Sequence, residues 1–140
     1  MTYLLDTNVI SEAVQNRPSE AVQNWLHNQR PEVLHISAIT LGELTRGIKA
    51  LPAGSRRERL EVWCGSIVGE FEPRTLPIDT AVALRWGELF AEAQANGSTL
   101  PMANSLIAAT ALVHDLTIVT RNVVDFERCG VPVLNPWTAG

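Results

Sequence analysis

Acidic and amide side chains follow two apolar segments of the chain at the point where each segment ends. Asp6 follows the run TYLL, and Asn122 and Asp125 come shortly after the run TIVT. Glu43 stands at the border of the apolar face in ITLGELTRGI rather than opposite it. Acids gathered at one place raise one another's pKa, an arrangement that persists mainly when a cation binds there. Oxygen ligands without His or Cys suit Mg²⁺ or Mn²⁺, and such a metal site can hydrolyse a phosphodiester bond.

Taken one at a time, each of these acids also has a simpler explanation. Asp6 could cap a helix that begins near Val9, and Glu43 could be an ordinary solvated carboxylate. Asp125 could cap a short turn before Phe126. A shared metal ion is the one explanation that covers all three acids together.

The segment LPMANSLIAATALVHD, residues 100–115, predicts a buried helix that starts at Pro101. Asn104 falls on its apolar face, because Ile107, Ala108 and Ala111 occupy the three-, four- and seven-residue spacings that share a helical face. A buried amide needs hydrogen-bond partners or a ligand. The position of Asn104 therefore indicates that its side chain binds a partner or a ligand.

Strands and helices alternate along the chain. The apolar runs predict strands over residues 2–5, 33–36, 75–78, 117–120 and 131–134. Periodic segments with start and stop signals predict helices over residues 9–15, 19–27, 38–51, 55–71, 80–96 and 100–115. Ser37 and Asp79 are expected caps, and Ser55 with Glu58 predicts a capping box. We expect one α/β domain over residues 1–140, with a Rossmann-like, largely parallel sheet flanked by helices on both faces.

The composition limits the function further. The 140-residue chain is 46% hydrophobic with a formal net charge of −4, which argues against a protein that coats nucleic acid by charge alone. Arg56, Arg57 and Arg59 form either a small basic patch or a solvated helix face. We find no apolar run long enough to span a membrane and no secretory signal, so we expect a cytoplasmic protein.

The residue types that usually hold zinc are not arranged to do so. The cysteines form no CxxC pair, and the histidines share no helical face with the acids at metal spacing. We interpret the two cysteines and the three histidines as structural or surface residues: Cys64, Cys129, His27, His35 and His114. Three tryptophans could line a partner groove or belong to the core: Trp25, Trp63 and Trp86.

Five stretches in series give the chain a specific resemblance. LLDTNVISE, ITLGELTRGI, LPMANSLIAATA, TRNVVDFE and VPVLNPW resemble, in this order, the PIN-domain ribonucleases, in particular the VapC and FitB-like toxins of bacterial toxin–antitoxin pairs. The resemblance implies a single PIN domain, a Mg²⁺ or Mn²⁺ site, cleavage of RNA and a homodimer. It also implies a small antitoxin as partner, contact with DNA only through that antitoxin, and no contact with membranes.

The resemblance carries residue roles onto this sequence. The positions that match the metal site are Asp6, Glu43, Asn104, Asn122 and Asp125, and all of these except Asn122 also match catalytic positions. The positions that match supporting polar residues are Thr7, Asn8, Ser37, Thr120 and Arg121.

Asn104 departs from the family, whose members usually carry aspartate there. An amide oxygen can bind Mg²⁺, but it brings no charge and its NH₂ group accepts nothing. Changes in residues that only support metal ligands commonly cost about 10–100-fold in metal affinity or activity, so loss of a ligand charge is expected to cost at least that. We therefore expect weak or absent nuclease activity. A natural variant and a deliberately inactivated enzyme fit this change equally.

Two other functions fit parts of the sequence. A catalytically silent module could dimerise, bind an antitoxin and support its binding to DNA. A phosphatase with Asp6 as nucleophile is a weaker alternative, because Asn8 stands where haloacid-dehalogenase-type enzymes carry their acid.

Overall fold

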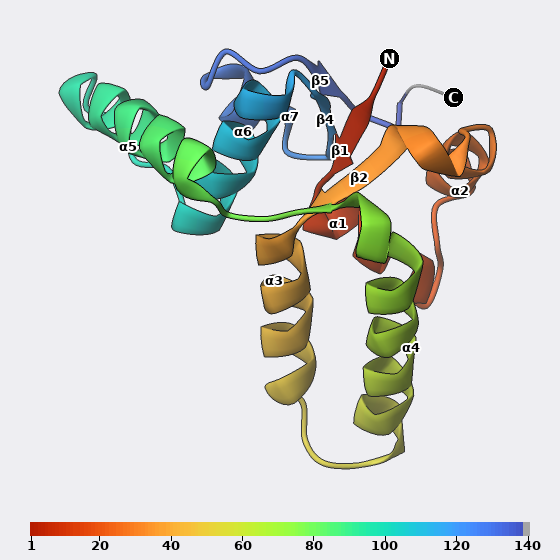
Figure 1. Ribbon diagram of the computed structural model, residues 1–140. Coiled ribbons are helices and arrows are strands. Elements are labelled where there is room, and N and C mark those ends of the chain that lie inside the picture. Colours follow the sequence, from red (N-terminus) through yellow and green to blue (C-terminus); the bar gives the residue numbers. More distant parts are fainter. Residues whose placement is uncertain (139–140) are drawn as a thin grey trace.

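Five parallel strands form one sheet in the computed structural model, which describes residues 1–138 (Figure 1). The strands are β1 (Tyr3–Leu5), β2 (Leu34–Ser37), β3 (Thr75–Leu76), β4 (Thr117–Val119) and β5 (Val133–Leu134). Their order across the sheet is β3-β2-β1-β4-β5, and every neighbouring pair is parallel. The predicted parallel α/β architecture is confirmed, with β1 at the centre.

Seven helices connect the strands within the described residues. They are α1 (Thr7–Ser11), α2 (Glu20–His27), α3 (Ala38–Lys49), α4 (Ser55–Phe71), α5 (Thr80–Ala95), α6 (Met102–His114) and α7 (Val123–Glu127). Short 3-10 segments cover Glu12–Val14, Pro31–Val33 and Glu72–Arg74. The sequence predicted the first six helices but missed α7, because one and a half turns are too few to show a helical period. No helix in the described part of the chain combines the length and apolarity needed to cross a membrane.

Helices cover both faces of the sheet, as alternate residues of β1 show. Leu5 packs into a core with Ile36 and Leu44, on the side of α1 to α4. Leu4 faces the opposite core, where it meets Ile107 of α6 and Phe126 of α7 among other residues. Both leucines are essentially inaccessible to solvent. The central strand is therefore buried on both sides, and its carboxyl end opens between the two helical layers.

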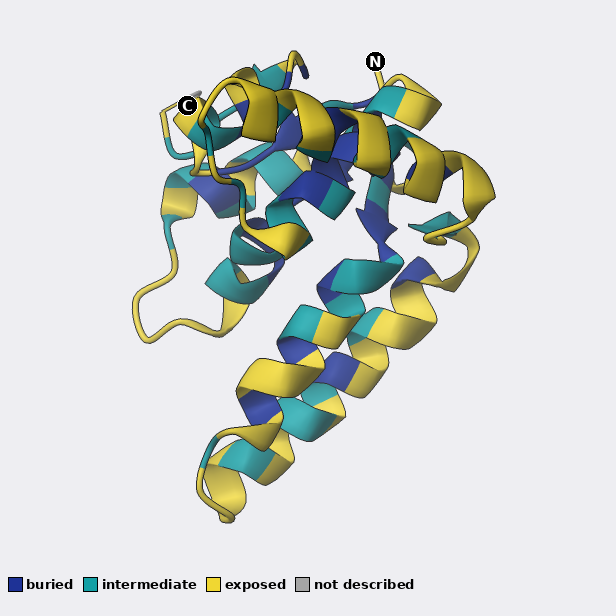
Figure 2. Ribbon diagram, turned by 90° about the vertical axis from the view of Figure 1, so that its left-hand side faces the viewer, coloured by how far each residue is buried: buried dark blue, intermediate teal, exposed yellow. Residues whose placement is uncertain are grey.

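The helices α3 and α4 form a hairpin that extends away from the sheet (Figure 1). A stripe of buried residues runs along the faces that the two helices turn toward each other (Figure 2), including Leu44, Ile48 and Cys64. Glu61 of α4 accepts a 2.6 Å ion pair from Lys49 of α3 on the surface of the hairpin. The hairpin holds Glu43 in place near its attached end.

The helix caps agree with the sequence at Ser37 and Asp79 but not at Ser55. The Ser37 side chain accepts a hydrogen bond from Ile39 N, and that of Asp79 accepts one from Val82 N. Ser55 is already inside α4, whose N-cap is Gly54, with no side-chain hydrogen bond at the cap. The predicted capping box at Ser55 is therefore wrong, although the helix itself is present.

This difference gives a matched pair of substitutions. Asp79→Ala is expected to lower the free energy of unfolding by about 1 kcal/mol, because Val82 N loses its side-chain partner. Ser55→Ala is expected to change it by less than about 0.5 kcal/mol, since Ser55 caps nothing. Urea denaturation of both variants measures the difference, and equal losses would contradict the assignment of the caps.

Candidate active site

Asp6 stands at the carboxyl end of the central strand, directly after β1. The chain leaves β1 for one side of the sheet and returns to the other, so β2 and β4 flank β1 and the site lies where the strand order reverses. Ligand sites of open parallel sheets lie at such points. Asp6 also caps α1, and its backbone N–H donates to Val119 O at 2.9 Å. Both the metal-site and the capping explanations of Asp6 are thus compatible with its position.

Three neighbours donate hydrogen bonds to the Asp6 carboxylate, which is only 3% exposed. Thr7 N donates to Oδ1 at 2.8 Å, and the Thr120 hydroxyl donates to Oδ2 at 2.8 Å. Asn8 Nδ2 lies 3.4 Å from the same Oδ2. These contacts fix the orientation of the carboxylate before any ligand is present.

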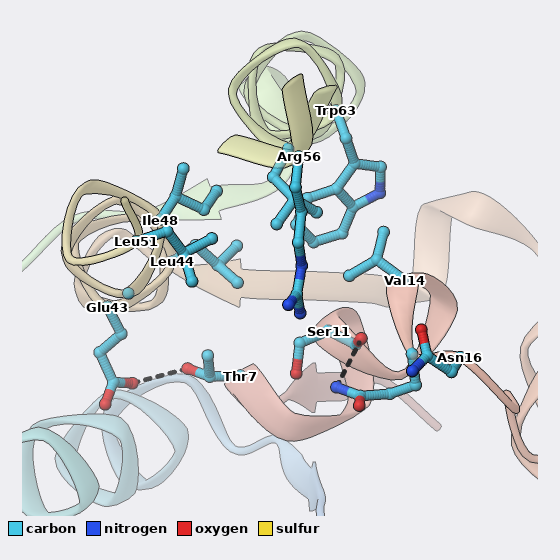
Figure 3. A pocket seen from close by; sticks show the side chains of 13 residues that line it. Thr7, Ser11, Val14, Asn16, Glu43, Leu44, Ile48, Leu51, Arg56 and Trp63 are labelled. Atoms are coloured by element: carbon cyan, nitrogen blue, oxygen red, sulfur yellow. Dashed lines mark hydrogen bonds between the residues drawn. The ribbon is translucent and has the colours of Figure 1, made fainter. Parts of the chain in front are cut away.

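Glu43 reaches the same place from the first half of α3. The Thr7 hydroxyl donates to Glu43 Oε1 at 2.6 Å (Figure 3). Because the backbone N–H of Thr7 binds Asp6 while its hydroxyl binds Glu43, a single residue links the two acids. Thr40, which the sequence did not single out, is fully buried with its hydroxyl 3.5 Å from that of Thr7.

Among the described residues, no cation pairs with either of the two linked acids. Burial raises the pKa of Asp6 above its ordinary value of 3.8, and the charge of Glu43 raises it further, while the hydrogen bonds from Thr120 and Thr7 act in the opposite direction. Within residues 1–138, neither Asp6 nor Glu43 takes part in an ion pair. A pair of neighbouring carboxylates without a basic partner is suited to a hard cation.

The raised pKa of Asp6 predicts a pH dependence of stability. Between pH 3.8 and the raised pKa, the folded chain binds more protons than the unfolded chain, so the free energy of unfolding falls as the pH rises. Asp6→Asn does not titrate. Denaturation at a series of pH values is expected to show the stability of Asp6→Asn, relative to the native chain, increasing across this window and then levelling off.

Glu61 offers a control with the opposite sign. The ion pairs with Lys49 and Arg57 lower the pKa of this exposed carboxyl below its ordinary 4.5, so its stabilising effect is lost as the pH falls. The stability of Glu61→Gln relative to the native chain is expected to decrease as the pH rises. If the two variants changed in the same direction, the pKa shift of Asp6 would be refuted.

Asn104 is less buried than its helical pattern predicted. It lies in the first turn of α6, which packs against α3, and its side chain is partly accessible. The preceding residues Pro101 and Met102 are exposed, so this end of α6 reaches the surface. The structure records no hydrogen bond from the Asn104 side chain to a described residue. The amide is therefore free to bind a ligand, and solvent removes the need for a buried partner.

The two residues expected after β4 occupy different places. Asn122 is the N-cap of α7, and its backbone N–H donates to the Thr120 hydroxyl oxygen at 2.9 Å, which ties it to the Asp6 network. Asp125 lies within α7 instead of the loop next to β4. Within residues 1–138, no three His, Cys, Asp or Glu side chains group closely enough to hold a metal ion. The described residues therefore contain no closely grouped trio of such side chains around Asp6 and Glu43, and the role expected for Asp125 stays a prediction.

Other expected supporting residues do surround Asp6. Asn8 Nδ2 lies 3.4 Å from Thr120 Oγ1, and Asn8 Oδ1 accepts a hydrogen bond from Arg121 N at 3.4 Å. Ser37 acts at a distance, because it caps the helix that carries Glu43. The network joins the start of the chain to the segment after β4.

A pocket of about 290 Å³ opens beside the acids and reveals a residue that the sequence left ambiguous. Thr7, Glu43 and Trp63 are among its lining residues, and Arg56 points into it from α4 (Figure 3). The basic patch is thereby divided: Arg57 pairs with Glu61 at 3.3 Å, whereas Arg56 faces the pocket. The arginine triplet was the available signal, but spacing alone did not show which arginine turns inward.

The remaining aromatic and thiol residues are mostly structural. Trp25 packs edge-on against Tyr3 with ring centroids 4.9 Å apart, and Trp86 Nε1 donates to Ser105 Oγ at 2.8 Å between α5 and α6. Trp63 both packs against the core and lines the pocket. Both cysteines are buried and free, in agreement with their interpretation as structural thiols.

The chain is similar to known proteins over nearly its whole length. The sequence profile of the PIN domain matches residues 3–130. The chain is 40% identical to a VapC ribonuclease of Sinorhizobium fredii over 138 residues, covering 96% of each chain. It is 41% identical to toxin FitB of Neisseria gonorrhoeae over 138 residues, covering 96% of this chain and 97% of the relative. A structure of FitAB bound to a DNA fragment superposes with a TM-score of 0.92 at 36% identity, covering 99% of this chain and 98% of that chain.

Proposed function

The chain belongs to the PIN-domain family, and we propose that it is a metal-dependent ribonuclease toxin of a VapBC- or FitAB-like toxin–antitoxin pair, with activity weakened by Asn104. The observation that carries this proposal is the joining of Asp6 and Glu43 through Thr7 at the carboxyl edge of the sheet. Two acids that have no basic partner within residues 1–138 suit metal binding in an enzyme better than they suit a purely structural site.

We assign the ligands of Mg²⁺ or Mn²⁺ to the carboxylates of Asp6 and Glu43 and the amide oxygens of Asn104 and Asn122, with Asp125 as an outer acid. When bound, the metal would polarise the RNA phosphate and lower the pKa of a water molecule. Thr120, Thr7 and Asn8 orient Asp6 for this task. Arg56 brings a positive charge to the adjacent pocket, where it can bind a phosphate.

Asn104 is expected to control how strongly the metal stabilises the fold. Asn104→Asp adds a third carboxylate to the site that we assign to the metal, so the metal-free variant is expected to melt at a lower temperature than the native chain. Added Mg²⁺ is expected to raise its melting temperature by more than it raises that of the native chain, since tighter binding to the folded state stabilises it more. Identical melting temperatures and identical Mg²⁺ responses would count against a shared metal site.

We further propose that the chain acts in the cytoplasm as a homodimer bound to a small antitoxin, and that it meets DNA only through that antitoxin. Structures of FitAB and of VapBC from Salmonella typhimurium, each bound to DNA, support an antitoxin partner. Exposed apolar side chains are available for protein contacts, among them Val62 of α4, which is 77% exposed, and Leu84 of α5, which is 67% exposed.

The direct test is cleavage of total cellular RNA by Asn104→Asp with Mg²⁺, with Mn²⁺ and with EDTA. We expect discrete products that require the metal. The matched control is Asn104→Asp combined with Glu43→Gln, which keeps the shape of the side chain but removes its charge, and it is expected to cleave nothing. Cleavage that persists in EDTA or in the double variant would overturn the assignment of the site.

The silent antitoxin-binding module remains the second candidate, and two observations favour it. The position usually held by aspartate is Asn104, and the described residues contain no group of three acids that could hold a metal. If Asn104→Asp also fails to cleave RNA while the native chain binds an antitoxin, this second function replaces the first.

A further inference from the structure

A second, larger groove is lined in part by Asn8. Its volume is about 670 Å³, and its lining includes Asn8, Arg17, Arg121 and Trp137. Arg17 follows the 3-10 segment after α1, whereas Arg121 and Trp137 come from the end of the chain. Segments from opposite ends of the sequence therefore build one surface.

Arg121 is held in a defined position within this groove. Its guanidinium carbon lies 5.1 Å from the centre of the Trp137 ring, a distance at which a cation is attracted to the face of an aromatic ring. Its backbone N–H is tied to Asn8 Oδ1. Trp137 is anchored in turn, because it packs against the core and its backbone N–H donates to Asn135 Oδ1 at 2.9 Å.

The groove is basic although the protein as a whole is acidic. Arg17 and Arg121 are both exposed, while the formal net charge of the chain is −4. The acidic residue among the described lining residues is Glu12, which accepts a hydrogen bond from Ser19 N at 2.8 Å, next to the start of α2. The other lining side chains include the amides of Gln15 and Asn16. Such a surface suits a ligand with phosphates and flat polar rings.

The groove connects directly to the proposed cleavage site. Asn8 lines the groove, and its Nδ2 lies 3.4 Å from Asp6 Oδ2. A ligand in the groove is therefore one side chain away from the carboxylate that we assign to the metal.

We propose that this groove binds single-stranded RNA beside the bond to be cut, with a nucleobase stacked on the guanidinium plane of Arg121, which Trp137 supports from the other side, and with Arg17 at a backbone phosphate. Arginine planes and aromatic rings are the usual platforms for unpaired bases, and exposed arginines follow the backbone. RNA fits better than a peptide, because the lining offers two cations and several amides but no continuous apolar wall. This inference rests on the proposed function and extends it from the cleavage site to the neighbouring nucleotides.

The test is binding of a short fluorescein-labelled single-stranded oligoribonucleotide to the native chain in EDTA, which prevents metal-dependent cleavage. Arg121→Gln is expected to weaken binding by about 5- to 150-fold, the range found for loss of one stacked base. Arg121→Lys keeps the charge but not the plane and is expected to weaken binding almost as much. Arg17→Gln is expected to reduce the slope of log K against log salt by about 0.7, the value for one lost phosphate contact.

Arg128 provides the matched control. It is exposed on the same C-terminal part of the chain but lines a different pocket, so Arg128→Gln is expected to leave binding within about twofold. Trp137→Phe keeps a ring to support Arg121 and is expected to lose less than Trp137→Ala. Circular dichroism melts identify any variant that fails to fold, and for such a variant the Phe or Lys substitution carries the test.

Cleavage kinetics separate this inference from the proposed function. In the Asn104→Asp background, Arg121→Gln is expected to raise KM for RNA more than it lowers kcat. Suppose that Asn104→Asp cleaves RNA while the Arg121 and Trp137 variants keep the same KM and the same affinity for RNA. The assignment of the groove to RNA would then be wrong, and the proposed nuclease function would still hold. Loss of antitoxin binding in these variants, with RNA binding intact, would assign the groove to a protein partner instead. Absence of cleavage by Asn104→Asp would overturn the proposed function, while oligonucleotide binding would still decide whether the groove holds RNA.

Discussion

Asn104→Asp is expected to increase metal-dependent RNA cleavage by at least about 10–100-fold over the native chain, the range by which even supporting residues alter metal sites. The increase has an electrostatic cause. The native chain links two carboxylates, Asp6 and Glu43, and the substitution adds a third carboxylate at a position that we propose as a metal ligand, on α6, which packs against α3. Initial rates on one RNA substrate at saturating Mg²⁺, measured side by side, give the ratio.

Because Asn104 is partly exposed, the comparison of the two forms measures the effect of the added charge on catalysis. An added carboxylate there remains in contact with water, so the substitution does not bury an unpaired charge, and the fold should tolerate it. Asn104→Ser is the matched control, because it offers an oxygen without a charge and is expected to remain as inactive as the native chain. Equal rates for the aspartate and asparagine forms would show that the charge at residue 104 is not what limits catalysis.

Phe126→Ala is expected to lower the free energy of unfolding by about 3–5 kcal/mol, the usual cost of removing a buried phenylalanine side chain. Phe126 is completely inaccessible and packs with Leu4 and Ile107 in the core on one side of the sheet. It is also the buried residue of α7, a helix of five residues that is too short to be stable without tertiary contacts. The substitution is therefore expected to loosen Asn122 at the start of α7 as well.

Val124 supplies a control in the same short helix. It is 61% exposed, so Val124→Ala is expected to change the free energy of unfolding by less than about 0.5 kcal/mol. Guanidinium denaturation measures both variants, and Phe126→Leu provides a milder substitution if the alanine form does not fold. A small effect of Phe126→Ala would mean that α7 is held by contacts other than this ring.

The sheet and the long helices could be predicted because each carries a repeated local signal. Short apolar runs predicted the strands, and cap residues such as Ser37 and Asp79 predicted where helices begin. The structure has these elements. The rule for parallel sheets also placed Asp6 at the carboxyl edge of the sheet, where the structure has it. By contrast, α7 is too short to repeat its pattern, so the sequence did not predict that Asp125 lies within a helix.

The finer parts of the site depend on contacts between residues far apart in the sequence. The Thr7 hydroxyl could bind many acceptors, and only the packing of α3 beside α1 brings Glu43 within 2.6 Å. Likewise, the helical period placed Asn104 on the buried face, but that period does not show that the first turn of α6 lies at the surface. Periodicity identifies the face of a helix, whereas tertiary packing decides how deeply each turn is buried.

The hydrogen bond between Thr120 and Asp6 spans 114 positions of the chain. During synthesis, Asp6 and Glu43 leave the ribosome early, but β4 and Thr120 follow only when most of the chain has been made. At about 5–20 residues per second, several seconds separate the two events. A nascent chain therefore carries Asp6 and Glu43 before it carries β4, the strand that pairs with β1 and brings the Thr120 hydroxyl to Asp6, so the carboxylate is fully oriented only late in synthesis.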